Sequence, residues 1–186
     1  MPHIQLPEGL PGITSGFAFR TETARPMRAL AEVLLRGPST LTSGEREMIA
    51  TFVSTQNDCY FCQTSHRAAA AHHLHGNYEL VDAVRFDYQT APISAKLKAL
   101  LAIAGKVQKG GKNVTSEDIA LARAEGATDL EIHDTVLIAA AFCMYNRYVD
   151  GLATFAPTDP QLYDEMGARM AHEGYISAPE STTAAR

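Results

Sequence analysis

The spacing of apolar residues constrains the fold of this chain more than any other feature. Between residues 24 and 154, apolar side chains recur mostly three and four positions apart, which is the period of an amphipathic α-helix. No convincing stretch of alternating β-branched residues, the pattern of a strand, interrupts them. The sequence therefore predicts an all-α protein.

Residues that cap helices place several of the helix ends. Thr42 with Glu45, and Thr128 with Glu131, have the spacing of a capping box, in which a hydroxyl and a carboxylate satisfy free N–H groups at a helix start. We expect a helix to begin directly after each threonine. The other helices are expected near residues 26–36, 58–74, 78–86, 95–108, 116–124 and 160–172, which makes roughly eight helical pieces.

Size and composition predict one domain over residues 1–186. A chain of 186 residues with 46% hydrophobic and 20% charged residues can bury a substantial core. We expect residues 1–22 to form an extended arm, residues 24–154 the helical core, and residues 176–186 a flexible tail with too few apolar side chains to order itself.

Charge and hydropathy argue against several classes of partner. The net charge is −5, and the scattered lysines and arginines form no basic face for nucleic acid. No run reaches the length of a membrane span, and the first thirty residues lack the apolar core of a secretory signal, so we expect a cytoplasmic protein. In a reducing compartment, a close cysteine pair is more often catalytic, redox-sensing or metal-binding than a structural disulfide.

The segment NDCYFCQTSH holds such a pair, Cys59 and Cys62, followed by His66. We expect Asp58 to cap this helix, with Cys59 in its first turn. Positions i, i+3 and i+7 of a helix lie within an arc of about 60°, so all three side chains share one stripe. The two cysteines can close a disulfide with little backbone movement, and His66 lies toward Cys62.

Two effects bear on which thiol reacts. The helix N-terminus favours a thiolate at Cys59, whereas His66 can take the proton of Cys62. Because proton transfer needs a positioned base, we assign Cys62 as the attacking thiol. Glu47 precedes Cys59 by twelve residues, on the preceding helix, from where it could orient His66.

This pattern of Glu47, Cys59, Cys62 and His66 resembles the alkylhydroperoxidase D-like or carboxymuconolactone decarboxylase-like family. The segment VSTQNDCYFC is similar to the peroxidase-related branch of that family, and the segment around residues 146–152 is more weakly similar. The chain departs from the alkylhydroperoxidase D proteins proper at Phe61, where they carry a histidine of the proton relay. The peroxidase-related branch commonly has an aromatic residue there.

The resemblance implies an all-helical domain with thiol-dependent peroxidase activity and no cofactor. In the family, Glu and His relay the proton of the second cysteine, roles that fall on Glu47 and His66. The implied partners are a hydroperoxide substrate and an external thiol or dithiol reductant. The family also implies a homo-oligomer, a trimer or hexamer, and the apolar helices near residues 95–104 and 136–144 point the same way.

Other readings of the cysteine pair remain open. It could reduce a disulfide of a partner protein, with peroxide as a minor substrate. It could also belong to a non-catalytic zinc or redox-responsive binding protein, with Cys59, Cys62, His66 and Glu47 as ligands, although a structural zinc site normally adds a second pair of ligands, which is missing here. We therefore expect no metal.

Cysteine and histidine residues outside this pattern are expected to be structural. Cys143 lies in a very apolar helix, where a free cysteine usually packs as a small hydrophobe. His72, His73 and His75 stand at the end of a helix, where the macrodipole alone favours them, so we do not expect them to bind metal.

Overall fold

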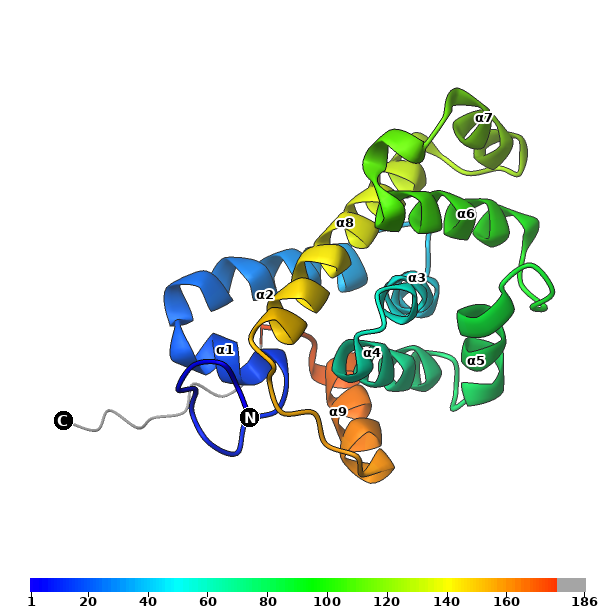
Figure 1. Ribbon diagram of the computed structural model, residues 1–186. Coiled ribbons are helices and arrows are strands. Elements are labelled where there is room, and N and C mark those ends of the chain that lie inside the picture. The colour runs from blue at the N-terminus through cyan, green and yellow to red at the C-terminus, as the bar shows by residue number, and fades with distance from the viewer. Residues whose placement is uncertain (177–186) are drawn as a thin grey trace.

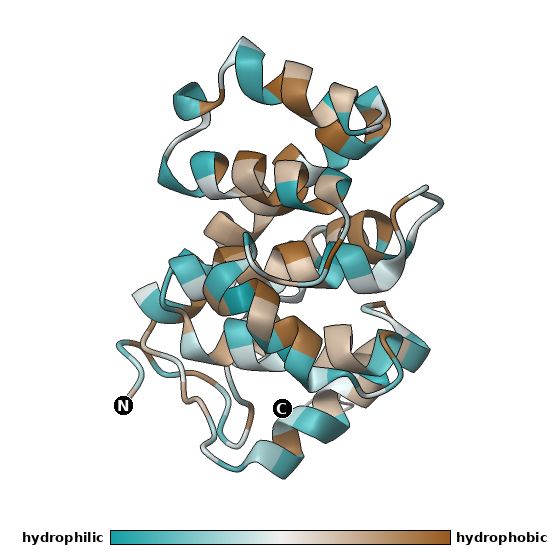
Figure 2. Cartoon of the chain, turned by 90° about the vertical axis from the view of Figure 1, so that its right-hand side faces the viewer, coloured by the Kyte–Doolittle hydropathy of each residue, from teal (hydrophilic) through white to brown (hydrophobic). Residues whose placement is uncertain are grey.

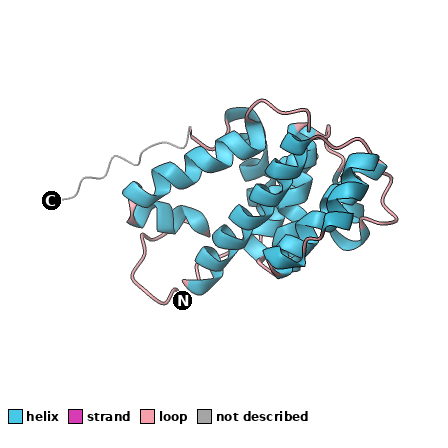
Figure 3. Cartoon of the chain, turned by 90° about the horizontal axis from the view of Figure 1, so that it is seen from above, coloured by secondary structure: helices cyan, strands magenta, loops and turns pink. Residues whose placement is uncertain are grey.

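The computed structural model describes residues 1–176, and this part of the chain is helical without a strand (Figure 3). It contains nine α-helices and one short 3-10 helix, so the predicted all-α class is confirmed and the predicted number of helices is close. The helices are α1 (Ile13–Phe19), α2 (Thr21–Arg36), α3 (Ser43–Gln56), α4 (Tyr60–His73), α5 (Tyr78–Asp87), α6 (Ala95–Lys109), η1 (Gly111–Asn113), α7 (Ser116–Ala124), α8 (Asp129–Gly151) and α9 (Pro160–Glu173).

Both predicted capping boxes form. The Thr42 N–H donates to the Glu45 carboxylate at 2.8 Å, and the Thr42 hydroxyl accepts from the Glu45 N–H at 3.2 Å. Thr128 and Glu131 repeat this arrangement at the start of α8. A cap of this kind typically stabilises a helix by about 1 kcal/mol, which explains why the sequence alone locates these starts.

The prediction of an extended arm over residues 1–22 is wrong in part, because α1 forms within it and α2 begins at Thr21. Tertiary contacts hold this short helix. Gly16 of α1 lies so close to α8 that an added Cβ would stand 2.5 Å from the Tyr148 hydroxyl oxygen. The preceding segment is tied down as well, since the N–H of Gly12 donates to the carbonyl of Phe155 at 2.7 Å. Local propensity did not indicate any of these contacts.

The main hydrophobic core lies where α3, α6 and α8 meet, and α3 and α6 are seen to the right of α8 in Figure 1. Apolar and polar residues alternate along the helices in the way expected of amphipathic helices (Figure 2). The apolar side chains of α6 that suggested a self-association surface, such as Leu100, Leu101 and Ile103, are fully buried within the same chain. Met144 of α8 is half exposed. The apolar side chains of α6 therefore give no support to self-association, whereas the prediction for α8 stays a prediction.

Helix α9 packs closely on α4, although it lies beyond the core expected over residues 24–154 (Figure 1). Gly167 makes this contact possible, because a Cβ there would meet the Ala68 Cβ at 2.4 Å and the Ala69 nitrogen at 2.7 Å. Residues 68–71, all alanine, are completely or almost completely buried at the crossing. The predicted tail, residues 176–186, falls outside the described residues except for Ile176.

In the described part of the chain, no helix is both long enough and apolar enough to span a membrane.

Candidate active site

The site begins at the tight corner between α3 and α4. Asp58 has a left-handed backbone with φ +56°, and Cys59 is extended, so Cys59 is the N-cap of α4. The prediction that Asp58 caps the helix, with Cys59 in the first turn, is therefore wrong by one residue. Aspartate tolerates the left-handed conformation that so short a connection needs. The corner is held by the Cys59 N–H, which donates to the Ser54 carbonyl at 3.1 Å, and by the Gln63 N–H, which donates to the Cys59 carbonyl at 2.9 Å.

Cys59 and Cys62 face each other across the first turn of α4. Cys59 is the N-cap of α4 and Cys62 is the third residue of the helix, so both belong to its first turn. Both thiols are free, and the residues are 0% and 4% exposed. The hydrogen bond to Cys62, followed by burial, raises the pKa of the Cys59 thiol far above its usual range. Cys59 is thus held in its neutral form beside Cys62.

Asp150, from the end of α8, lies beside Cys59. Burial raises the pKa of Asp150, a hydrogen bond with Cys59 partly opposes that shift, and the Asp150 charge in turn disfavours a thiolate at Cys59. The helix N-terminus favours ionisation of Cys59, whereas His66 favours that of Cys62. At Cys59 the hydrogen bond to Cys62, burial and the Asp150 charge all raise the thiol pKa and so oppose the effect of the helix N-terminus.

His66 and Glu47 are brought together across the α3–α4 pair. The imidazole Nδ1 lies 2.8 Å from Glu47 Oε2, and the Glu47 side chain is completely buried whereas that of His66 is 13% exposed. Phe142 meets the edge of the imidazole ring, with ring centroids 4.6 Å apart. Because Glu47 occupies Nδ1, Nε2 is the ring nitrogen left for proton exchange.

Tyr175 completes this group, and sequence analysis missed it. Its hydroxyl donates to Glu47 Oε1, and its ring stacks on His66 with centroids 6.0 Å apart. Its backbone N–H donates to Glu32 Oε2 at 2.7 Å, which fixes the chain just after α9. Burial and the Glu47 charge raise the pKa of the Tyr175 phenol well above its usual range. No spacing pattern could have linked a residue so far along the chain to Glu47.

Tyr163 covers the cysteine pair from α9. It belongs to the same small cluster of buried side chains as Cys59, Cys62 and Phe61. Its hydroxyl is buried and has no hydrogen-bond partner among the described residues. Burial and the neighbouring side chains raise the pKa of this phenol. The cysteine pair is thus closed off on this side.

Cys143 lies away from the pair, partly buried against the main core as expected. Its sulfur makes only weak contacts, at 3.6 Å to Asn57 Nδ2 and 3.9 Å to the Gln108 carbonyl. His72 pairs with Asp164 at 2.9 Å. Among residues 1–176, no group of three or more His, Cys, Asp or Glu side chains is arranged to hold a metal ion.

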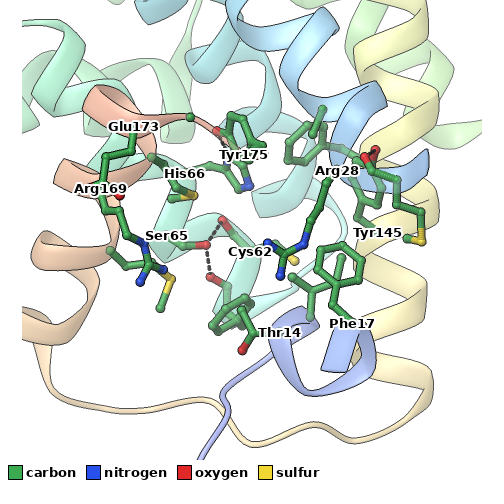
Figure 4. Close-up of a pocket in the computed structure, with 18 residues that line it drawn as sticks. Thr14, Phe17, Arg28, Cys62, Ser65, His66, Tyr145, Arg169, Glu173 and Tyr175 are labelled. Atoms are coloured by element: carbon green, nitrogen blue, oxygen red, sulfur yellow. Dashed lines mark hydrogen bonds between the residues drawn. The ribbon is translucent and has the colours of Figure 1, made fainter. Parts of the chain in front are cut away.

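A cavity of about 110 Å³ opens beside Cys62 and His66 (Figure 4). Its walls are mostly apolar and come from α1, α2, α4, α8 and α9. Such a site excludes bulk water from the reacting atoms while a few polar groups orient a ligand. The apolar lining includes Ile13, Phe17, Met27, Phe61, Phe142 and Met166, and the polar lining includes Arg28, Cys62, His66, Arg169 and Tyr175.

Residues 21–104 match the carboxymuconolactone decarboxylase family. An uncharacterized peroxidase-related protein from Silicibacter sp. TM1040 is 29% identical, with a TM-score of 0.74 over 83% of this chain and 78% of that one. Another from Ralstonia eutropha JMP134, described as an alkylhydroperoxidase AhpD core, is 28% identical, with a TM-score of 0.75 over 86% of this chain and 82% of that one.

A protein of unknown function from Agrobacterium tumefaciens, 19% identical, shares the fold with a TM-score of 0.68 over 80% of this chain and 99% of its own. No curated protein matches the sequence. The matched segment contains Glu47, Cys59, Cys62 and His66, the residues on which the predicted resemblance rested. The family match over residues 21–104 and the two peroxidase-related structures support the predicted resemblance to the alkylhydroperoxidase D-like, carboxymuconolactone decarboxylase-like family.

Proposed function

We propose that the protein is a thiol-dependent peroxidase in which Cys62 attacks the peroxide and Cys59 resolves the product. One observation carries the proposal. Cys62 shares an apolar cavity with His66, and Nδ1 of that histidine is 2.8 Å from the buried Glu47 carboxylate. A nucleophile, a base and a group that orients the base are the components of an activated thiol.

In the first step, Nε2 of His66 takes the proton of Cys62, and the thiolate attacks the terminal oxygen of the hydroperoxide. A sulfur–oxygen bond forms as the oxygen–oxygen bond breaks. The alkoxide that leaves takes the proton back from His66 and departs as the alcohol. Cys62 is oxidised to a sulfenic acid, and the peroxide is reduced.

In the second step, the Cys59 thiol attacks the sulfenic sulfur of Cys62. A disulfide forms, the sulfur–oxygen bond breaks, and the hydroxyl group leaves with the thiol proton as water. An external thiol or dithiol then reduces the disulfide by exchange and is itself oxidised. A neutral, buried Cys59 suits this order of events, because a resolving thiol is needed only after Cys62 has been oxidised.

Reduction of a partner protein's disulfide is less well supported. Cys59 is 0% exposed and Cys62 4%, so a disulfide on another protein has no direct access to either sulfur. A small peroxide can enter the cavity. We also propose that the protein acts in the cytoplasm without a metal or cofactor. We also propose self-association as a trimer or hexamer, which light scattering at micromolar concentration would test.

The function is tested by following consumption of hydrogen peroxide and tert-butyl hydroperoxide in the presence of a dithiol. We expect Cys62→Ser to abolish turnover. Cys59→Ser should consume about one equivalent and accumulate a sulfenic acid that dimedone traps. Cys143→Ser is the control and should behave as the parent. A parent protein that consumes neither peroxide faster than Cys62→Ser would overturn the proposal.

A further inference from the structure

Two arginines reach into the cavity from opposite sides. Arg28 comes from α2 and Arg169 from α9, and both side chains point inward toward the space beside Cys62 (Figure 4). The described lining contains a single acidic side chain, Glu173. Neither arginine has a part in the chemistry of the cysteine pair described above.

Among residues 1–176, neither guanidinium group has a carboxylate partner of the kind that several other arginines have. Arg67, also partly buried, forms a bidentate pair with Asp82, with nitrogen–oxygen distances of 2.6 and 2.5 Å. Arg28 instead lies over the ring of Phe17 at 5.0 Å, and within residues 1–176 no carboxylate forms a salt bridge with it or with Arg169. Burial, and then the Arg169 charge, lower the pKa of Arg28. Two arginines and one glutamate line this otherwise apolar cavity, so the lining carries a net positive charge that an anion would balance.

The arginines also stand on the route to Cys62. A larger groove of about 630 Å³ adjoins the inner cavity, and the two share Thr14, Phe17, Arg28, Met166 and Arg169. Cys62 and His66 line only the inner cavity. A molecule whose peroxide group lies at Cys62 therefore has the rest of its body beside both guanidinium groups.

We propose that the substrate is a short organic hydroperoxide that carries a carboxylate, which Arg28 and Arg169 bind while the peroxide group lies at Cys62. This inference rests on the proposed peroxidase function. The planar guanidinium group pairs with both oxygens of a carboxylate, which gives orientation as well as attraction. The small inner cavity limits the spacer between the two groups to a few carbon atoms. The carboxylate itself takes no part in the electron transfer, so the products are the hydroxy acid and water.

A matched set of substrates tests this recognition. 3-Hydroperoxy-3-methylbutanoate is tert-butyl hydroperoxide extended by a carboxylate, and its methyl ester has the same shape without the charge. We expect the parent to prefer the acid over the ester in kcat/KM. Arg28→Gln or Arg169→Gln should reduce this preference about 10- to 100-fold, the usual value of a hydrogen bond to a charged group. Arg28→Lys should restore part of it, because it keeps the charge but loses the planar pair of donors.

Arg20→Gln is the matched control, because this substitution removes the same charge. Arg20 is exposed and lies outside both cavities. The Arg20→Gln variant should prefer the acid over the ester as strongly as the parent does. Equal rates for acid and ester in the parent, or an equal loss in Arg20→Gln and Arg28→Gln, would overturn the inference and leave the peroxidase proposal standing.

Binding of the unreactive hydroxy acid separates the two proposals. Calorimetric titration with 3-hydroxy-3-methylbutanoate should show binding by the parent that is lost in Arg28→Gln and weakened by salt. Arginine-dependent binding by a protein that reduces no peroxide would support the anion site and contradict the peroxidase function. No binding and no preference for the acid would contradict the anion site.

Discussion

Tyr175 donates a hydrogen bond to Glu47, and the other oxygen of the same carboxylate lies 2.8 Å from Nδ1 of His66. The end of the described chain thus holds the residue that orients the histidine. Because Gly174 and Tyr175 follow α9 directly, the packing of α9 on α4 sets the position of this phenol.

Tyr175→Phe removes the hydroxyl and keeps the ring that stacks on His66. We expect the free energy of unfolding to fall by about 1.5–3 kcal/mol, as for a lost hydrogen bond to a charged group. Oxidation of Cys62 by peroxide should also slow, and its pH profile should change, because Glu47 loses the donor that fixes its carboxylate and so orients His66 less firmly. Stopped-flow measurement of thiol loss between pH 6 and 9 checks this. Tyr88→Phe serves as the control, and equal profiles in both variants would show that Tyr175 is only structural.

His66→Gln removes the proposed base, and Glu47→Gln weakens its positioning. General-base catalysis is typically worth about 10² to 10⁴ in rate, so His66→Gln should have the larger effect. Raising the pH should partly rescue His66→Gln, because hydroxide can then generate the thiolate. Rates of thiol loss equal to those of the parent across pH 6 to 9 in both variants would rule out the relay.

How far the sequence predicts this site depends on how local its parts are. Glu47, Cys59, Cys62 and His66 lie on two consecutive helices, so their spacing alone brings them together. The helix starts at Ser43 and Asp129 could be predicted for the same reason, since capping involves residues three positions apart.

Distant contacts were not predictable. Tyr175 and Arg169 reach the site only because Gly167 lets α9 approach α4, a contact that no local pattern records. The seven-residue helix α1 also depends on its contacts with α2 and α8. At the corner between α3 and α4, Asp58 has a left-handed backbone and Cys59 is therefore the N-cap. The predicted N-cap was one residue too early, and capping preferences alone could not distinguish the two positions.

Gly167→Ala tests the α4–α9 contact. The added methyl group would lie 2.6 Å from the Ala68 carbonyl carbon, so the helices must separate. We expect a loss of about 1–3 kcal/mol in stability, as for overpacked cores. Peroxide turnover should fall as well, because Tyr175 and Arg169 move with α9. Gly151→Ala is the control, since nothing lies within 4 Å of a Cβ there. A fully stable and active Gly167→Ala variant would contradict this role of the contact.

The surroundings of the Glu131 carboxyl group allow a prediction of how the stability of the protein changes with pH. Burial alone would raise its pKa, but hydrogen bonds from the Lys96 ammonium at 2.7 Å, the Thr128 N–H at 2.7 Å and the Thr40 hydroxyl lower it to about 2. A carboxyl whose pKa is lowered on folding stabilises the protein above its unfolded pKa. This contribution should disappear as the pH falls from 4.5 to about 2.

Glu131→Gln should therefore unfold more easily at neutral pH, by about 1–3 kcal/mol, and should lose less stability between those pH values than the parent. Urea unfolding at a series of pH values measures both effects. Asp129→Asn, at an exposed carboxylate of the same helix, is the control. A Glu131→Gln variant with the acid sensitivity of the parent would contradict the assignment.

The central claim is that the cysteine pair reduces a peroxide, and a single turnover tests it most directly. Fully reduced protein is mixed with one equivalent of tert-butyl hydroperoxide without any reductant, and the products are analysed by peptide mapping and by assay of the remaining peroxide. We predict that the peroxide is consumed, that tert-butyl alcohol appears, and that Cys59 and Cys62 form a disulfide while Cys143 stays free. Peroxide that persists as in buffer alone, or a disulfide that includes Cys143, would contradict the account.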